Sequence, residues 1–327
     1  MSTAARLHQF GKPAESLALG DVAVPSPGPE EVLLDMLAAP INPADLNVIE
    51  GTYADLPELP ATIGNEGVGR VATVGTNVTC LKPGQLVLPM AFGTWCRQMI
   101  VPARNAVPLP DGLDIFQAAM LTVNPATAWR TLHDFVKLEP GDWVVQNAAN
   151  SGVGRSVIQL ARAMGWNTLN VVRRPELVGE LTAAGGTVVV TEECDLRREG
   201  RSLCGGSSPK LALNAVGGPS ALNVANALAT GGTMVTFGAM SKQPLKIPNG
   251  LLIFKGLKFT GFWLNRWRKN AAASVREETY AALAGHLKAG TLFTPVHETH
   301  PLARILDAVE AAGKDQRGGK VLLDLAA

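Results

Sequence analysis

Up to about residue 115, the apolar residues of the chain form short runs that are cut by proline and glycine. Four of these runs are EEVLLDMLAAP (30–40), EGVGRVATVG (66–75), GQLVLPM (84–90) and CRQMIVP (96–102). Short apolar runs bounded by turn residues are typical of strands joined by tight connections. This part of the chain is therefore predicted to form a compact antiparallel β-domain.

From about residue 140 the pattern changes, because strand-like runs alternate with helix-like ones. The strand-like runs are DWVVQN (142–147), TLNVV (168–172), GTVVV (186–190), KLALNAV (210–216) and GTMVTFG (232–238). Regular alternation of strand and helix indicates a parallel sheet with right-handed crossovers. The predicted fold class is α/β, with a doubly wound Rossmann sheet beside the β-rich domain.

The last part of the chain contains two further strand–helix patterns. Residues 257–263 and 274–290 read as a strand and a helix that complete the parallel sheet. A helix over 301–313, with apolar positions at three- and four-residue spacing, and a strand over 319–325 have no further alternation to join. We therefore expect the tail to return to the N-terminal domain.

The chain has 327 residues, which is more than a single hydrophobic core usually serves. The two patterns divide it into a first domain of residues 1–119, completed by residues 290–327, and a Rossmann domain of residues 120–289. The first domain is thus expected to be discontinuous.

Composition and charge limit the possible partners. Hydrophobic residues make up 46% of the chain, charged residues 17%, and the formal net charge is +1. This balance is that of a globular protein and argues against nucleic acid as a partner. No apolar run approaches the ~18 residues of a membrane span, and the opening MSTAARLHQFGKP resembles neither a secretory signal nor a long transit segment. The expected location is cytoplasmic.

The stretch NAANSGVG (147–154) lies where the first Rossmann strand meets its helix. A dinucleotide-binding turn needs small residues here, because backbone N–H groups at the helix start must approach the pyrophosphate. Alanine, serine and two glycines fill the stretch, although the G-x-G-x-x-G spacing is absent. Taken alone, it is either a phosphate-binding turn or an ordinary strand-to-helix corner.

The end of the second strand favours the phosphate-binding turn. NAD enzymes place an acidic residue about 20 residues after the glycines, to hold the ribose 2′-OH, whereas NADP enzymes place arginine nearby. Here Arg173 and Arg174 end the strand, and no acidic residue precedes Glu176. Two guanidinium groups match a 2′-phosphate in charge and geometry. The predicted cofactor is therefore NADPH.

Six long segments carry a family resemblance, and NSGVG, NVVRR and GFWLNRW (261–267) are the most specific motifs. The segments are residues 41–75, 123–129, 147–174, 238–244, 251–263 and 318–325. They resemble the trans-2-enoyl-thioester reductases of the medium-chain dehydrogenase/reductase superfamily, in the branch of the mitochondrial enoyl reductases. The similarity runs from about residue 6 to residue 325.

This resemblance implies a GroES-like catalytic domain wrapped around a Rossmann domain, and a homodimer. It implies an enzyme of fatty acid metabolism that uses NADPH to reduce the 2,3 double bond of a trans-2-enoyl-CoA or enoyl-ACP. Hydride would reach the β carbon and a proton the α carbon. Tyr53 matches the family's proton donor or enolate stabiliser, whereas Tyr280, the other tyrosine of the chain, is expected to pack inside a helix.

Further positions carry over as cofactor contacts. Asn124 corresponds to the contact beside the nicotinamide, and Lys320 would close the cleft from the returning tail. The pyrophosphate loop and the nicotinamide end are assigned to Asn150, Ser151, Gly152, Val153, Gly154, Phe237, Gly238, Ala239, Met240, Phe262, Trp263 and Leu264. Without the resemblance, Phe262 and Trp263 would be interpreted as core packing, and which of the two arginines holds the 2′-phosphate stays open.

No metal site is expected. Zinc alcohol dehydrogenases of the superfamily take ligands from a cysteine and from the histidine of a GHE triplet, but this chain has Asn42 or Pro43 at the first place and Asn65 at the second. Hydrogen bonds must then supply the electrophilic stabilisation. Asn42, Asp45 and Asn47 are either polar support for the site or an ordinary polar turn.

The basic cluster of Arg266, Arg268 and Lys269 allows two interpretations. It is either a mouth for anionic CoA or acyl carrier protein, or a solvated basic turn. The function is open in the same way. An NADPH-dependent quinone or enone reductase of the same superfamily would share fold and cofactor, so it is the nearest competing function. An NADPH-binding protein with little catalysis is the second.

Overall fold

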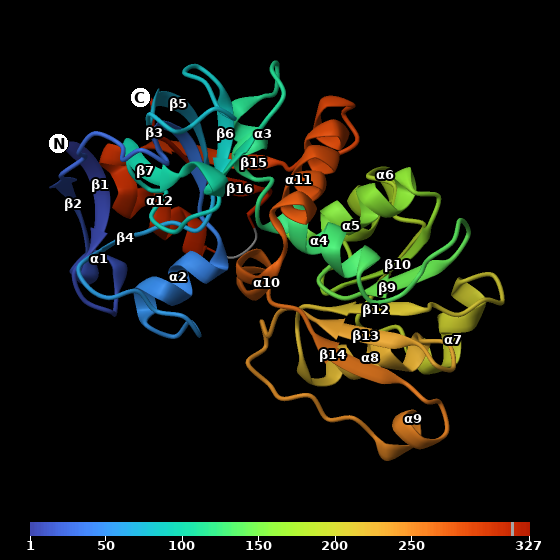
Figure 1. The fold of residues 1–327 in the computed structure, drawn as a ribbon. Helices are drawn as coiled ribbons and strands as arrows, with labels where there is room; N and C mark the ends of the chain where they lie inside the picture. Colours follow the sequence, from blue (N-terminus) through green and yellow to red (C-terminus); the bar gives the residue numbers. More distant parts are fainter. Residues whose placement is uncertain (315–316) are drawn as a thin grey trace. The chain divides into compact units, whose positions relative to one another are not determined.

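The computed structural model describes residues 1–314 and 317–327, which form two compact units. Unit 1 comprises Met1–Val123 and Ala272–Ala327, and unit 2 comprises Asn124–Ala271 (Figure 1). Each unit has its own sheets and its own hydrophobic core. The architecture confirms the predicted fold class, an α/β protein with a doubly wound Rossmann sheet beside a β-rich part.

Unit 1 contains two sheets. A three-stranded sheet has the order β2-β1-β4, and a larger sheet has the order β15-β16-β3-β5-β6-β8, with β7 also paired to β3. The strands pair antiparallel, except for β15 and β16, which pair in parallel. The strands are β1 (Ser2–Leu7), β2 (Leu17–Val22), β3 (Glu31–Pro40), β4 (Ala61–Thr62), β5 (Val68–Val74), β6 (Leu86–Pro89), β7 (Gln98–Pro102), β8 (Ala106–Pro108), β15 (Val296–Pro301) and β16 (Lys320–Asp324).

The C-terminal tail is part of unit 1. Strand β16 pairs antiparallel with β3, with Leu322 opposite Pro40. Helix α12 (Ile305–Gly313) buries Ile305, Ala308 and Val309 in the core of this unit, as its three- and four-residue spacing predicts. The other helices of unit 1 are α1 (Pro13–Ser16), α2 (Pro43–Glu50), α3 (Ile115–Ala119) and α11 (Ala273–Lys288).

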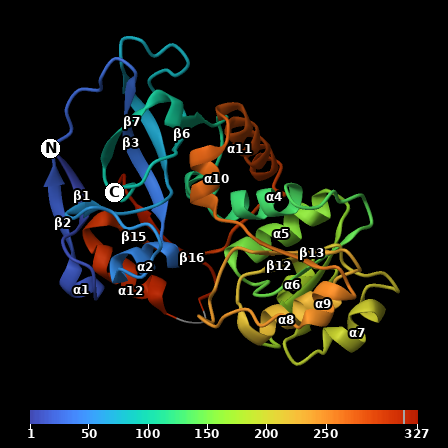
Figure 2. The ribbon, with the colours of Figure 1, turned by 60° about the horizontal axis from the view of Figure 1, so that its bottom comes forward.

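Unit 2 is a doubly wound parallel sheet. Its strand order is β11-β10-β9-β12-β13-β14, which is the Rossmann order 3-2-1-4-5-6 when β9 is counted as the first strand. Helices α4 and α5 lie on one side of the sheet and α8 on the other (Figures 1 and 2). The strands are β9 (Trp143–Gln146), β10 (Asn167–Val172), β11 (Val188–Thr191), β12 (Leu211–Asn214), β13 (Thr233–Thr236) and β14 (Lys258–Gly261). The helices are α4 (Asn124–His133), α5 (Gly152–Ala163), α6 (Leu177–Ala183), α7 (Leu196–Leu203), α8 (Gly218–Ala227), α9 (Asn249–Ile253) and α10 (Leu264–Asn270).

The predicted domain boundaries, 1–119 with 290–327 and 120–289, stay a prediction. The compact units differ from them mainly in the placement of α11, which was expected to complete the Rossmann domain and is grouped with unit 1. Within unit 1, α11 contacts α3 and buries Tyr280 and Leu283. The apolar periodicity of a helix shows that one of its faces is buried, but it does not show which unit covers that face. The sequence pattern of α11 therefore fits packing against either unit.

In the part of the chain that the structure describes, no helix is both long and apolar enough to cross a membrane.

The four cysteines are free thiols in different surroundings. Burial raises the pKa of Cys96 to about 12 and that of Cys204 to about 11, so both stay protonated at neutral pH. Cys80, in contrast, is exposed.

Candidate active site

The connection between β9 and α5 is a tight turn with a left-handed residue at Ala148, whose φ is 47°. The N–H of Ser151 donates to the Ala148 carbonyl at 2.9 Å. Ser151 then caps α5, because its Oγ accepts the N–H of Gly154 at 3.1 Å. An alanine in this conformation costs on the order of 1 kcal/mol, and such strain is concentrated at ligand sites.

The two glycines of this loop are sterically required. A Cβ added at Gly154 would lie 2.5 Å from the Ala149 carbonyl oxygen, so the first turn of α5 can approach the preceding loop this closely only with glycine. A Cβ added at Gly152 would lie 2.9 Å from the Cγ of Asn124, the first residue of α4. Asn124 therefore lies directly against the loop, and its role as a cofactor contact stays a prediction.

A buried amide network supports the loop from below, and the sequence reasoning missed it. Gln146 Nε2 donates to the Gly154 carbonyl at 2.9 Å and to Asn170 Oδ1 at 2.8 Å. Asn170 Nδ2 donates in turn to Thr168 Oγ1 at 2.8 Å and to the Val188 carbonyl at 3.0 Å. These side chains are almost fully buried, and a buried amide without a partner costs about 1–3 kcal/mol. The signal was present as polar residues inside otherwise apolar strands.

The two arginines after β10 differ in their surroundings. Arg174 Nη1 lies 3.5 Å from Glu176 Oε1, whereas Arg173 is exposed and forms no salt bridge within the described ranges. A third arginine, Arg155 of α5, was not singled out from the sequence. It pairs with Glu180 of α6 at 2.5 Å, and its Nε donates to the Asn150 carbonyl at 3.2 Å. Arg155 thus ties the loop to the helix that follows the arginine pair.

Two asparagines meet where the strand order of unit 2 reverses, between β9 and β12. Asn147 Nδ2 donates to Asn214 Oδ1 at 2.9 Å, and Asn147 Oδ1 accepts the N–H of Ala215 at 2.8 Å. Asn214 Oδ1 also accepts the N–H of Gly217 at 3.0 Å. Ligands of doubly wound sheets bind at this switch point, so the two asparagines are further candidates for shaping the site.

The segments after β13 and β14 leave the sheet at the carboxyl ends of its strands, as the α5 loop does after β9. Phe237 and Phe262 donate their N–H groups to the carbonyls of Asn214 and Thr236, at 3.0 and 2.9 Å. Gly238 is held close to Ala215, because an added Cβ would lie 2.8 Å from the Ala215 carbonyl oxygen. Phe262 packs edge-on against Phe135, with ring centroids 6.2 Å apart, so the packing interpretation describes part of its surroundings. Trp263 and Leu264 begin α10, and Met240 is exposed.

Since all strands of this sheet are parallel, their carboxyl ends share one edge. The predicted cofactor residues of unit 2 follow these ends at β9, β10, β13 and β14. The fold therefore gathers residues 150–154, 173–174, 237–240 and 262–264 at that edge.

Tyr53 and Lys320 belong to unit 1. Tyr53 follows α2, which ends at Gly51 with a φ of 77°, and the N–H of Thr52 returns to the Asn47 carbonyl at 2.9 Å. The Tyr53 side chain is half-buried and packs on the core of unit 1. The Lys320 ammonium donates to Asn42 Oδ1. Tyr280 packs in the core as predicted, and its hydroxyl donates to the Thr122 carbonyl at 3.3 Å.

Asn42 and Asp45 form a buried polar cluster with Glu66 and Lys320. The N–H of Asn42 donates to Asp45 Oδ2 at 2.8 Å, which completes a capping box at the start of α2. Asn42 Nδ2 donates to Glu66 Oε1 at 2.7 Å. Burial raises the pKa of Asp45 to about 7, against the opposing effect of the Asn42 N–H and with a further increase from Glu66. Burial also lowers the pKa of Lys320, against the attraction of Glu66 and Asp45.

Within residues 1–314 and 317–327, no group of histidine, cysteine, aspartate and glutamate side chains is arranged to hold a metal ion.

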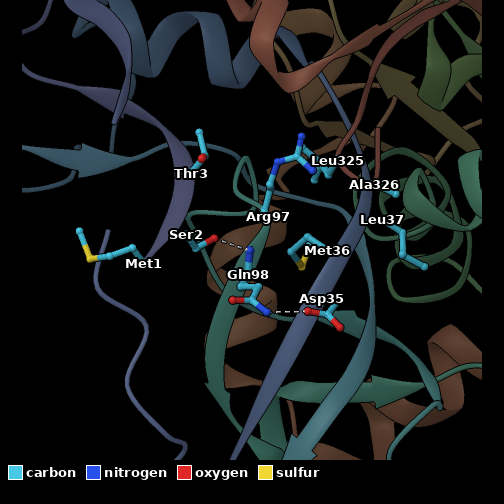
Figure 3. Close-up of a pocket in the computed structure, with 10 residues that line it drawn as sticks. All are labelled: Met1, Ser2, Thr3, Asp35, Met36, Leu37, Arg97, Gln98, Leu325 and Ala326. Atoms are coloured by element: carbon cyan, nitrogen blue, oxygen red, sulfur yellow. Dashed lines mark hydrogen bonds between the residues drawn. The ribbon is translucent and has the colours of Figure 1, made fainter. Parts of the chain in front are cut away.

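A cavity of about 360 Å³ opens on unit 1 beside both ends of the chain (Figure 3). Gln98 bridges it, because its N–H donates to Ser2 Oγ at 2.9 Å and its Nε2 to Asp35 Oδ1 at 2.8 Å. The residues around it are Met1, Ser2, Thr3, Asp35, Met36, Leu37, Arg97, Gln98, Leu325 and Ala326. None of the predicted site residues lines this cavity.

Comparisons with known proteins agree on the fold. Residues 28–111 match the alcohol dehydrogenase GroES-like domain, and residues 152–282 match the family described as zinc-binding dehydrogenase. A human protein named mitochondrial enoyl-[acyl-carrier-protein] reductase is 44% identical over 322 residues, which is 96% of this chain and 86% of the relative. A similar protein of the same name from Xenopus tropicalis is 43% identical over 304 residues, covering 90% of this chain and 87% of the relative.

Two solved structures are similar over nearly the full length. A complex of Etr1p with NADP and crotonyl-CoA is 32% identical, with a TM-score of 0.88 over 99% of both chains. A putative NADPH:quinone reductase from Bacillus thuringiensis is 30% identical, with a TM-score of 0.92 over 99% of this chain and 98% of the other.

The expected cytoplasmic location is wrong, because the curated relatives at 43–44% identity are named mitochondrial proteins. The prediction relied on the residues at the start of the sequence. A targeting segment is removable and places no constraint on the folded units, so those units carry no information about compartment.

Proposed function

The chain belongs to the enoyl-[acyl-carrier-protein] reductase family of the medium-chain dehydrogenase/reductase superfamily, and on that premise we propose that it reduces the 2,3 double bond of trans-2-enoyl thioesters with NADPH. The observation that carries the proposal is the edge of the unit 2 sheet. At that edge the capped α5 loop follows β9 and the Arg173–Arg174 pair follows β10. Asn124 lies against the loop at Gly152. The size and charge of these residues fit a dinucleotide that carries a 2′-phosphate.

Each residue has a distinct task in this proposal. Bound NADPH supplies the hydride for the β carbon. The N–H groups at the start of α5 bind the pyrophosphate, because a helix N-terminus attracts an anion. Arg173 takes the 2′-phosphate, since Arg174 is already paired with Glu176. The Tyr53 hydroxyl stabilises the negative charge that develops on the thioester oxygen and supplies the proton for the α carbon.

The carrier of the acyl group is proposed to dock on α10. Arg266 and Lys269 are exposed and three residues apart, so they lie on one face of this helix. Arg268 is half-buried, and the neighbouring Trp267 ring lies 5.2 Å from the Arg130 guanidinium. Both CoA and acyl carrier protein present anionic groups to such a surface. Because the proposed substrates are enoyl thioesters of CoA or acyl carrier protein, we also propose a role in fatty acid metabolism.

We further propose a homodimer that forms through β14. This strand is the outermost strand of the unit 2 sheet on one side, and an outermost strand has unpaired backbone groups that can bond to a strand of a second copy. Three apolar residues near it are exposed, namely Leu252 at 47%, Ile253 at 70% and Phe254 at 85%. A similar solved structure is the Etr1p/Etr2p heterodimer of the mitochondrial 2-enoyl thioester reductase from Candida tropicalis. Size-exclusion chromatography with light scattering tests the dimer, and a monomer at micromolar concentration contradicts it.

The experiment that tests the function is NADPH oxidation with crotonyl-CoA, longer 2-enoyl-CoAs and 1,4-quinones in parallel. The proposal expects turnover with the thioesters and little with the quinones. The quinone arm is included because a putative NADPH:quinone reductase is among the similar structures. Turnover with quinone alone supports a quinone reductase, and tight NADPH binding without any turnover supports a binding protein.

A further inference from the structure

We propose that Glu66 is a positioning residue of this reductase, which holds the helix leading to Tyr53 and the segment leading to Asn124 in fixed register. The inference rests on the proposed function, because it concerns the placement of that reaction's groups. It adds a residue in the connection between β4 and β5 to those that determine the rate. Glu66 acts through other residues.

Both carboxylate oxygens of Glu66 accept hydrogen bonds, and they come from separate segments. Oε1 accepts from Asn42 Nδ2 at 2.7 Å. Oε2 accepts from Thr122 Oγ1 at 3.1 Å and from the N–H of Val123 at 2.8 Å. The Glu66 side chain is fully buried, and its own carbonyl accepts from Thr94 Oγ1 at 2.7 Å. A buried carboxylate with these donors has little freedom to move.

The first segment leads from Asn42 to Tyr53. Asn42 begins α2 and closes a capping box with Asp45, so its position fixes the start of the helix. The helix has 8 residues, which corresponds to about 12 Å of rigid rise. At its other end, Gly51 and Thr52 are hydrogen-bonded back to the last turn, and Tyr53 follows directly. A shift at Asn42 is therefore carried to Tyr53.

The second segment is Thr122–Val123, which directly precedes Asn124. Glu66 holds both its hydroxyl and its backbone N–H, and the Tyr280 hydroxyl holds the Thr122 carbonyl at 3.3 Å. Thr122 is fully buried. Because the Thr122–Val123 segment is held on both sides, its position within unit 1, relative to the start of α2, depends on Glu66.

The test is Glu66→Gln, which keeps the size but replaces an acceptor oxygen by an amide that donates. The new amide NH₂ group faces a hydrogen-bond donor, either Asn42 Nδ2 or the donors of Thr122 and Val123. The hydrogen bonding on that side of residue 66 is therefore lost. We expect kcat with crotonyl-CoA to fall about tenfold to a hundredfold, as for a displacement of reacting groups by up to 1 Å. The Kd for NADPH, measured by fluorescence in the absence of substrate, should change less than about threefold because unit 2 is unaltered.

A double variant restores the pairing. In Asn42→Asp/Glu66→Gln the new amide donates to the new carboxylate, the net charge is unchanged, and aspartate remains a good helix N-cap. We expect its kcat to return to within about threefold of the original protein. A milder variant, Thr122→Val, removes one of the bonds at constant shape and should lower kcat about threefold to tenfold.

Unchanged kcat in both Glu66→Gln and Thr122→Val overturns the inference. So does a loss in Glu66→Gln that accompanies an equal loss of NADPH affinity and is not recovered in the double variant, because that pattern indicates general destabilisation. If the unaltered protein reduces quinones and not enoyl thioesters, the proposed function fails, and the same variants are then assayed with the quinone. The two failures are thus separable.

Discussion

The two units prepare their parts of the site by different means. Unit 2 relies on backbone geometry and neutral groups, with a left-handed Ala148, glycines that admit close approach and a buried Gln146–Asn170 network. Unit 1 relies on ionisable groups, with the buried Asp45 and Glu66 and the half-buried Lys320 in one cluster. Unit 2 should therefore be sensitive to added volume, and unit 1 to changes of charge and protonation.

The largest effect is expected from Tyr53→Phe, which removes one hydroxyl from unit 1 and changes no volume in unit 2. Loss of a general acid or enolate stabiliser should lower kcat about 10²- to 10⁴-fold while the Kd for NADPH stays the same. Tyr280→Phe is the comparison variant, because it removes the hydroxyl of the other tyrosine of the chain, which donates to the Thr122 carbonyl at 3.3 Å. Steady-state kinetics with crotonyl-CoA measure both, and equal losses in the two variants would remove the special role of Tyr53.

Asp45→Asn tests the charge-based character of unit 1 through pH. The folded-state pKa of Asp45 is raised from 3.8 to about 7, so between these values the folded protein binds more protons than the unfolded chain. The free energy of unfolding contributed by this group is therefore greatest below pH ~4 and falls as pH rises to about 7, by on the order of 2 to 4 kcal/mol. Thermal unfolding of both proteins from pH 4 to 8 measures it. The difference should move in favour of the variant as pH rises, and a pH-independent difference contradicts the assignment.

Gly154→Ala tests the shape-based character of unit 2. The added methyl would lie 2.5 Å from the Ala149 carbonyl oxygen, so the start of α5 must move away from the loop, which displaces the N–H groups proposed to bind the pyrophosphate. We expect the Kd for NADPH to rise about tenfold to a hundredfold, which is the effect of losing one to two charge-assisted hydrogen bonds.

The control for that variant is Gly179→Ala in α6, where an added Cβ meets nothing within 4 Å. This exchange should stabilise the helix by about 0.5–1 kcal/mol and leave the Kd unchanged. If Gly154→Ala binds NADPH as tightly as this control, the loop is an ordinary corner and the contrast between the units fails.

The smallest effect is expected from a change of charge in unit 2, at the salt bridge between Arg174 and Glu176. Glu176→Gln releases Arg174 from its salt bridge, so a second guanidinium becomes available for the 2′-phosphate. The Kd for NADPH should fall about twofold to fivefold at low ionic strength, with a smaller change at high salt, because an exposed ion pair contributes about 0.2–1 kcal/mol. The Kd for NADH, which lacks that phosphate, should not change.

The alternation of strands and helices and the strand-to-helix turn at 147–154 could be predicted from the sequence, because each is a local pattern. The cofactor role of that turn and of the arginine pair stays a prediction. The Asn42–Glu66–Lys320 cluster could not be predicted, since its members lie far apart in the chain and the pairing of β16 with β3 brings Lys320 beside the start of α2. The polar residues inside β9 and β10 were a local signal that was not used. The grouping of α11 with unit 1 shows a different limit, because a buried stripe does not identify its partner.

The pairing of β16 with β3 also has a consequence for the synthesis of the protein. Strand β3 ends at residue 40, whereas β16 begins at residue 320, so nearly the whole chain must leave the ribosome before this sheet is complete. Unit 2 is continuous in sequence and can fold during that interval. Until the tail is synthesised, β3 lacks its partner strand β16, and the core of unit 1 lacks the apolar residues of α12. During translation, the N-terminal part of the chain is therefore the one that needs protection from aggregation.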